Sequence, residues 1–254
     1  MFLEERQNKI LEQIKQESSI KVNDLSSTYN VSEVTIRRDL EELEKAGLIK
    51  RTHGGAIYVQ GGELESTFAT TVTQNIEVKE KLGKAAAELV TGDSTVFLES
   101  STTVLHIARN LGAKNNLTVV TNSPHIMIEL AQHKNKMKII SVAGEFDREV
   151  MSIQGYFAEK VLSEMNYDTA FIGISAIDAD LMMSTSFPEE ARLKQIVMQR
   201  SKEVIGIADG TKFGKKFLVP IAPVKRLNCL IVDSSIPEEY AAKVRGQGIK
   251  LIVT

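Results

Sequence analysis

From residue 77 to residue 254, segments with helical periodicity alternate with short apolar runs that are typical of buried strands. The pattern predicts a helix over residues 79–90 and a strand over 94–99. It then predicts helices over 103–111, 124–132, 155–164, 188–201 and 235–245, and strands over 117–121, 137–142, 169–174, 203–208, 229–232 and 250–253. Strands that alternate with helices of this length form a mainly parallel sheet with helices on both faces. We therefore predict that residues 77–254 form one α/β domain.

The first 58 residues have a mostly helical pattern instead. Residues 4–16 are expected to form a first helix. Residues 24–29 are expected to form a short second helix, for which Asn23 is a suitable N-cap. Asn30 is suited to the left-handed backbone of a tight turn. Helices of these lengths joined by so short a turn predict a helix-turn-helix.

A third helix is expected over residues 32–46, and it carries its own start and stop signals. Ser32 can accept a hydrogen bond from a backbone amide at the start, and Gly47 follows the last periodic residues. The apolar residues Ile36, Leu40 and Leu43 recur on one face, which is therefore expected to be buried.

Residues 48–58 contain two strand-like segments joined through Gly54 and Gly55. Such a hairpin beside a helix-turn-helix makes a winged helix. Residues 59–76 are polar and rich in glycine and threonine, and we predict that they are a linker to the α/β domain.

The overall charge does not favour the binding of nucleic acid, since the net charge of the chain is −2. Residues 1–60 alone hold nine lysines and arginines against ten aspartates and glutamates. DNA binding would have to come from local arrangement, because a near-neutral protein can still present one basic face to phosphates. The first turns of a recognition helix enter the major groove. The predicted DNA contacts on the third helix and the wing are Ser32, Thr35, Arg37, Arg38, Lys50, Arg51 and His53. The alternative is a helical interaction module.

In parallel α/β sheets, ligands bind beyond the carboxyl ends of the strands. The segment Ser100–Thr103 follows one predicted strand and begins a helix, so its hydroxyls and amides would favour an anion such as phosphate. Plain N-capping is the alternative. Other strand ends supply Asn122, Asp178, Asp209 and Lys212, and Lys212 is either a ligand-binding cation or a solvated loop lysine.

The stretch Val31-Ser-x-x-Thr-Ile-Arg-Arg-Asp-Leu40, followed by Arg51-Thr-His-Gly-Gly-Ala56, resembles the signature of the DeoR family of bacterial transcription regulators. The resemblance implies a winged helix-turn-helix in which Thr35, Arg37 and Arg38 face a double-stranded DNA operator. Operators are read as half-sites by symmetric proteins, so a homo-oligomer, either a dimer or a tetramer, is expected.

The resemblance extends through the α/β domain, in segments such as Phe97-Leu-Glu-Ser-Ser-Thr-Thr103 and Lys212-Phe-Gly214. It implies a fold similar to ribose-5-phosphate isomerase and a phosphorylated sugar or related metabolite as effector. Carried over by position, the phosphate would be held by Ser100, Ser101, Thr102 and Thr103, and the sugar pocket would be lined by Asp178, Lys194 and Lys212. With Asn122 and Asp209, these residues are the predicted effector site.

The chain departs from the family pattern in that same site. Ser101 stands where relatives have a glycine, and similar replacements fall at Ala143, Ser175-Ala176 and Met182-Met183. Glycines in phosphate loops allow close backbone approach, so we expect a reshaped pocket that accepts a different ligand, binds weakly or has lost binding. The arginine that similar proteins carry before the first helix of this domain is missing from residues 70–74.

Together these features predict a transcriptional regulator, a repressor of a carbohydrate-metabolism operon, with no catalytic residue, cofactor or metal. The alternative is a sugar-phosphate isomerase with a fused helical domain, which would need Asp178 and Lys212. The single cysteine, Cys229, lies in an apolar strand pattern and is expected to be buried. No signal peptide or membrane-spanning run is visible, and the predicted location is the cytoplasm.

Overall fold

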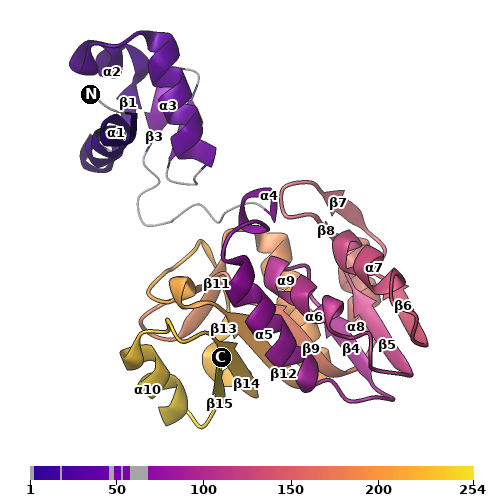
Figure 1. Cartoon of the computed structure of the whole chain (residues 1–254). Helices are drawn as coiled ribbons and strands as arrows, with labels where there is room; N and C mark the ends of the chain where they lie inside the picture. Colours follow the sequence, from indigo (N-terminus) through magenta and orange to yellow (C-terminus); the bar gives the residue numbers. More distant parts are fainter. Residues whose placement is uncertain (1–2, 18, 46–48, 53, 58–67) are drawn as a thin grey trace. The chain divides into compact units, whose positions relative to one another are not determined.

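The computed structural model describes residues 3–17, 19–45, 49–52, 54–57 and 68–254 (Figure 1). The chain divides into two compact units, Met1–Ser66 and Thr67–Thr254. The expected stop at Gly47, the wing residue His53 and the first half of the expected linker, residues 59–67, lie outside the described residues. Residues 68–76 of that linker belong to the second unit.

The N-terminal unit is a three-helix module with a small antiparallel sheet in the order β1-β3-β2. Asn30 takes the expected left-handed backbone, with φ 51° and ψ 48°, in the turn between the second and third helices. Ile36, Leu40 and Leu43 are buried against the first two helices, which confirms the predicted apolar stripe. The elements are α1 (Leu3–Glu17), β1 (Ser19–Lys21), α2 (Val22–Tyr29), α3 (Glu33–Lys45), β2 (Lys50–Thr52) and β3 (Gly55–Ile57).

The start of α2 differs from the prediction, because Lys21 and not Asn23 is its N-cap and no side chain caps it. The Val22 amide donates to the Gly54 carbonyl at 2.9 Å, and the Val22 side chain is buried, so β1 runs directly into α2. Close packing also explains Gly55, since a Cβ there would overlap the Ile20 carbonyl oxygen of the paired strand. The wing hairpin therefore depends on a residue without a side chain at this position.

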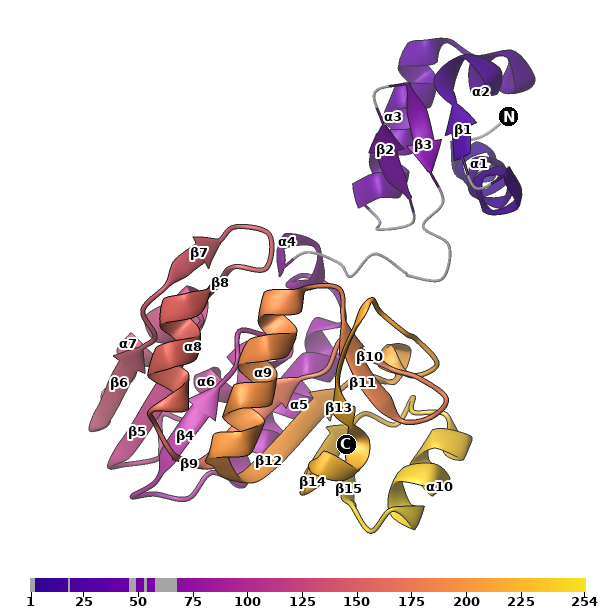
Figure 2. The same cartoon turned by 180° about the vertical axis from the view of Figure 1, so that it is seen from behind.

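The C-terminal unit is built on a seven-stranded parallel sheet in the order β15-β14-β12-β9-β4-β5-β6. Its strands are β4 (Thr95–Leu98), β5 (Leu117–Thr121), β6 (Met137–Ser141), β9 (Tyr167–Gly173), β12 (Ser201–Ala208), β14 (Cys229–Val232) and β15 (Lys250–Val253). Helices cover both faces, as predicted. Figure 1 shows the face under α5 (Ile76–Glu88) and α6 (Thr102–Arg109), and Figure 2 the face under α8 (Tyr156–Ser163) and α9 (Pro188–Arg200). The remaining long helices are α7 (Pro124–Ala131) and α10 (Glu238–Gly246).

Each face has its own apolar core. The sheet packs on one side against α5, α6 and α7 and on the other against α8, α9 and α10. Cys229 is buried in the first core, as expected, and burial raises the pKa of its thiol. The predicted α/β fold class is thus confirmed for this unit.

The strand order contains a topological switch between β4 and β9. The strands that follow β4 along the chain, β5 and β6, are added on one side, whereas those that follow β9, namely β12, β14 and β15, are added on the other. At the carboxyl ends of the two strands, the connection that leaves β4 and the connection that leaves β9 therefore run toward opposite edges of the sheet. In open α/β sheets this is the position at which ligands bind.

Several short elements were not predicted, because their sequences contain neither a long proline-free apolar run nor an extended alternation of apolar and polar residues. They include the hairpin β7 (Glu145–Asp147) with β8 (Ser152–Gln154), and the antiparallel sheet of β10 (Ala176–Ile177), β11 (Met182–Thr185) and β13 (Val219–Pro223). The others are α4 (Phe68–Thr71) and two 3₁₀ turns, η1 (Gly210–Lys212) and η2 (Val224–Arg226). Among the described helices, none has the length and apolar character needed to cross a membrane.

Candidate functional site

The start of α3 is fixed by Ser32. Its hydroxyl oxygen accepts from the Thr35 amide at 3.2 Å and lies 2.9 Å from the Thr35 hydroxyl, while its carbonyl accepts from the Ile36 amide at 3.1 Å. Ser32 is therefore the N-cap of α3, as its sequence position predicted. Both side chains remain near the surface at the first turn of the helix.

Arg37 and Arg38 are both exposed on α3, one turn beyond the cap. Arg37 Nη2 lies 3.4 Å from Glu33 Oε2, and both side chains are about half exposed, so water screens this pair strongly. Such an arginine can exchange its carboxylate for a phosphate or a base edge at small cost. The two predicted contacts on the helix thus lie side by side on one open face.

Asp39, the next residue, points into the N-terminal unit instead. Its carboxylate forms a bidentate pair with Arg6 of α1, with Nε to Oδ2 at 2.6 Å and Nη2 to Oδ1 at 3.1 Å. This hydrogen bond raises the pKa of Arg6 above its usual value. Arg6 was not singled out from the sequence, although an aspartate on the edge of an apolar stripe is a signal that a cationic partner is needed.

The wing places the backbones of Lys50 and Arg51 in β2, opposite Ile57 and Ala56 of β3. The side chains of Lys50 and Arg51, and the whole of His53, lie outside the described part of the chain. Their part in DNA contact remains a prediction.

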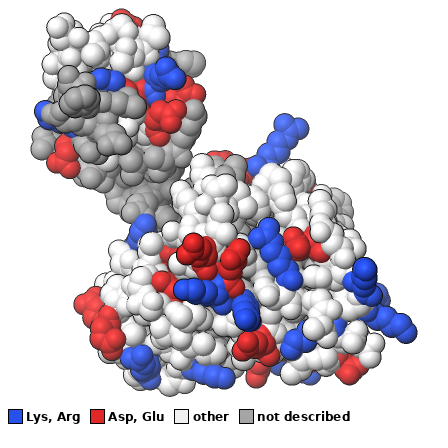
Figure 3. Space-filling model, viewed as in Figure 1, with Lys and Arg blue, Asp and Glu red and all other residues white. Residues whose placement is uncertain are grey.

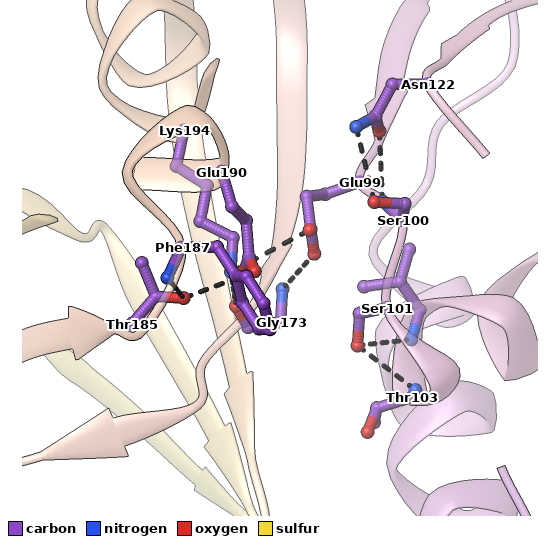
Figure 4. Close-up of polar contacts among 11 residues, drawn as sticks. Glu99, Ser100, Ser101, Thr103, Asn122, Gly173, Thr185, Phe187, Glu190 and Lys194 are labelled. Carbon is purple, nitrogen blue, oxygen red and sulfur yellow. Dashed lines mark hydrogen bonds and ion pairs between the residues drawn. The ribbon is translucent and has the colours of Figure 1, made fainter. Parts of the chain in front are cut away.

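Ser101 caps α6 at the carboxyl end of β4. Its Oγ accepts from the Thr103 amide at 3.1 Å and from the Val104 amide at 3.5 Å (Figure 4). Thr102 and Thr103 are buried in the first turn. These are the amides that an anion at the start of α6 would use, so the serine hydroxyl occupies the position that a glycine would leave open.

Ser100 is tied to Asn122 at the end of the neighbouring strand β5. The Ser100 amide donates to Asn122 Oδ1 at 3.0 Å, and Asn122 Nδ2 donates to Ser100 Oγ at 3.2 Å. Figure 4 shows the amide and the serine facing each other. The structure thus brings these two predicted residues together, with Ser101 beside them.

A buried charged cluster lies across the switch point from Ser101. Lys194 Nζ on α9 donates to the Gly173 carbonyl at 2.8 Å and to Glu190, and lies 3.7 Å from Glu99 Oε1. Glu99 Oε2 in turn accepts from the Gly173 amide at 3.1 Å. The Lys194 side chain is only 2% exposed, and Glu99 only 4%. Lys194 therefore joins β4, β9 and α9 (Figure 4).

Glu99 was not among the predicted site residues. For Glu99 the signal was an acidic residue directly after the apolar run Val96-Phe-Leu98, since a carboxylate at the end of a buried strand needs a partner. The partner is remote in sequence, so its identity could not be deduced.

Asp178 lies in the turn between β10 and β11. Oδ1 accepts from the amides of Asp180 at 3.0 Å and Met182 at 2.9 Å, and Oδ2 lies 3.6 Å from Lys216 Nζ. Both carboxylate oxygens therefore have partners that shape this turn. Their first role is structural.

Asp209 and Lys212 follow the carboxyl end of β12. Asp209 caps η1 by accepting from the Thr211 amide at 3.0 Å, and the Lys212 amide donates to the Asp209 carbonyl at 3.1 Å. The buried Lys79 of α5 interacts electrostatically with both residues. Burial first, and repulsion from Lys212 second, lower the pKa of Lys79 to about 8.

Lys79 was also missed in the sequence, because a lysine in the first turn of a helix normally lies in solvent. Its Nζ donates to the Thr71 carbonyl in α4. Lys79 and Lys212 thus lie near Asp209 at this strand end, where Asp233 also accepts from the Gly210 amide at 2.7 Å. Perturbed lysines that gather at the end of a buried strand are typical of a ligand-binding site.

Two family models match the chain: a DeoR-like helix-turn-helix domain over residues 6–61, and the DeoR C terminal sensor domain over residues 74–234. The chain belongs to the DeoR family of transcriptional regulators. Membership agrees with the helix-turn-helix of the N-terminal unit and assigns a sensor role to the C-terminal unit.

DeoR-family relatives match over nearly their whole lengths. The chain is 31% identical to the HTH-type transcriptional regulator GlpR of Haloferax volcanii over 252 residues, which is 99% of this chain and 98% of that protein. It is 32% identical to the transcriptional repressor AccR of Agrobacterium fabrum, covering 94% and 96%, and 30% identical to the transcriptional repressor GlcR of Bacillus subtilis, covering 100% and 97%.

A solved ribose 5-phosphate isomerase from Methanocaldococcus jannaschii overlaps 55% of this DeoR-family chain, with 17% identity and a TM-score of 0.39. This likeness is too weak to bear on activity. Within the described part of the chain, no three or more His, Cys, Asp or Glu residues are grouped so that they could hold a metal ion.

Proposed function

We propose that this DeoR-family protein is a repressor that binds operator DNA through the first turns of α3 and the β2–β3 wing. The observation that carries the proposal is the outward face of α3, where Arg37 and Arg38 are exposed beside the Ser32–Thr35 cap. One arginine suits a guanine edge and the other a phosphate. The acidic neighbour Asp39 is buried with Arg6, so its charge is neutralised within the protein.

The C-terminal unit, in this proposal, senses a phosphorylated sugar or related metabolite at the carboxyl ends of β4, β9 and β12. The supporting features are the topological switch and the positive charge of Lys79 and Lys212 at one strand end. The residues we assign to the effector are Ser100, Ser101, Thr102, Thr103, Asn122, Asp178, Lys194, Asp209 and Lys212, with Lys79 added from the geometry. The face of this unit seen in Figure 3 intersperses basic with acidic side chains, so a specific site and not a broad basic surface has to attract the anion.

We assign DNA binding to residues 1–58, the connection to residues 59–76, and sensing and oligomerisation to residues 77–254. A cytoplasmic homo-oligomer, a dimer or tetramer, would place paired winged helices on the two half-sites of an operator. The effector would then act by favouring one of two arrangements of the oligomer. A regulator fits better than an isomerase, because Asp178 already has turn amides and Lys216 as partners.

The test is a gel shift of the purified chain on the DNA upstream of its own gene. Arg37→Ala and Arg38→Ala are each expected to weaken binding at least about tenfold, and the variant that loses the phosphate contact is expected to lower the salt slope by about one. Arg245→Ala is the matched control, because Arg245 is a similarly exposed, ion-paired arginine on α10. Unchanged binding by both helix variants would overturn the DNA assignment.

The effector assignment needs its own experiment. A panel of sugar phosphates is added to the same gel shift and to thermal unfolding of the wild type and of Lys212→Ala. We expect one compound to release the DNA and to raise the melting temperature of the wild type but not of Lys212→Ala. If no sugar phosphate in the panel changed either the gel shift or the melting temperature, the effector assignment would be contradicted.

A further inference from the structure

Val34 is an apolar side chain at the centre of the outward face of α3. Its side chain is 76% exposed, and among the described residues of the N-terminal unit no other large apolar residue is exposed. Nine residues, or about two and a half turns, separate it from the buried Leu43, so the two point in opposite directions. Val34 therefore faces directly away from the core of the unit.

The folded protein alone gives no reason for a valine here. Valine is a weaker helix former than alanine or the polar residues common on exposed faces. Its methyl groups are in water, so they contribute no burial. A single exposed apolar residue is ordinary on a protein surface, so the weight of Val34 comes from its place on the face of α3 that is proposed to enter the groove.

The neighbours of Val34 determine which part of α3 can approach DNA. Arg37 and Arg38 stand three and four residues further on and lie on the same face. The next turn of that face exposes Glu41 and Glu42, which DNA phosphates repel. Glu33 in the first turn is paired with Arg37, so the two arginines leave the first turns with a net positive charge, which directs these turns and Val34 toward the groove.

The major groove offers one apolar group, the 5-methyl group of thymine. We propose that Val34 is a specificity-determining residue that packs against a thymine methyl group, between the contacts made by Arg37 and Arg38. This inference rests on the proposed DNA-binding function. It adds a base preference that the arginines cannot provide.

The experiment begins with selection of binding sequences from a random duplex pool by the full-length wild-type protein. Each thymine of the selected site is then replaced in turn by uracil, which removes only the 5-methyl group. Affinities are measured for the wild type, for Val34→Ala and for the control Ile128→Ala, which removes an exposed apolar side chain from α7 of the other unit.

We expect one position in each half-site at which uracil weakens wild-type binding by about three- to tenfold. Val34→Ala should bind the thymine site about tenfold more weakly and lose its sensitivity at that position only, while Ile128→Ala should behave as the wild type. Equal uracil sensitivity in the wild type and Val34→Ala at every position, or a selected site without thymine, would overturn the inference. A pool that yields no enriched sequence would overturn the proposed function itself, and this inference with it.

Discussion

Gly173, the last residue of β9, packs directly against the side chain of Ser101, which follows β4. A Cβ on Gly173 would overlap both Oγ and Cβ of Ser101 and would lie 3.2 Å from Glu99 Oε2. The two residues therefore set how closely β4 and β9 approach at the topological switch, where the effector is proposed to bind.

Gly173→Ala is expected to destabilise the C-terminal unit by about 1–3 kcal/mol, because overpacking forces a rigid strand end apart. Gly246→Ala, where a Cβ meets nothing within 4 Å, is the matched control and should change stability little. The double variant Gly173→Ala with Ser101→Gly should recover much of the loss. Urea unfolding of the four proteins measures this, and a double variant no more stable than Gly173→Ala would contradict the packing argument.

Ser101→Gly alone is expected to increase the affinity for inorganic phosphate. It frees the Thr103 and Val104 amides at the start of α6, and it should lower stability by only a few tenths of a kcal/mol, since glycine is a tolerable N-cap. The readout is the rise in melting temperature with phosphate, compared with the wild type. Ser123→Gly, which removes the corresponding cap of α7, is the control. Equal phosphate responses in all three proteins would show that the Ser101 hydroxyl does not block an anion.

The low pKa of Lys79 predicts a pH dependence of stability. Its pKa is about 8 in the folded protein and close to 10.5 when the lysine is in water, so the unfolded chain binds more protons between these values. The penalty for the buried charge is complete below about pH 8 and disappears as the pH rises toward 10.5. The free energy of unfolding of the wild type should therefore rise over this range relative to Lys79→Met.

Lys84→Met is the control for that measurement, because Lys84 is an exposed lysine on the same helix. The free energy of unfolding of Lys84→Met should change with pH in the same way as that of the wild type from pH 8 to 10.5. If Lys79→Met also ran parallel, Lys79 would titrate as an ordinary lysine.

Much of the fold could be predicted, because long periodic segments report directly on burial. The strands over 117–121, 229–232 and 250–253 lie where the sequence pattern placed them, and the helix after Ser123 begins at Pro124. The prediction that Asn23 caps the second helix was wrong because of a tertiary contact. Val22 is held in the core and bonded to Gly54, which outweighs the preference of asparagine for an N-cap.

The candidate site was less predictable, because its contacts join residues far apart in the chain. The sequence singled out Ser101 and Lys194 separately, but it gave no means to pair Lys194 with Glu99, which is 95 positions earlier. The burial of Lys79 could not be predicted for the same reason, since it depends on contacts with α4 and with the loop after β12. A periodic pattern shows which face is buried, and not which charges meet there.

The pair of Arg6 and Asp39 predicts how the N-terminal unit responds to loss of one charge. Asp39→Ala leaves a buried guanidinium without its carboxylate, which is expected to destabilise the unit by about 3–5 kcal/mol. Hydrogen exchange of α1 and α3 in the full-length chain should then accelerate about a hundredfold or more, and DNA binding should fall with it.

Glu33→Ala is the control, because it removes only the exposed partner of Arg37, and it should change hydrogen exchange by less than about threefold. Replacing both buried partners, by Arg6→Met with Asp39→Leu, should restore slow exchange, because apolar side chains of similar volume need no counter-charge. Exchange as fast in this double variant as in Asp39→Ala would mean that the specific geometry of the pair, and not its unpaired charge, holds α3 in place.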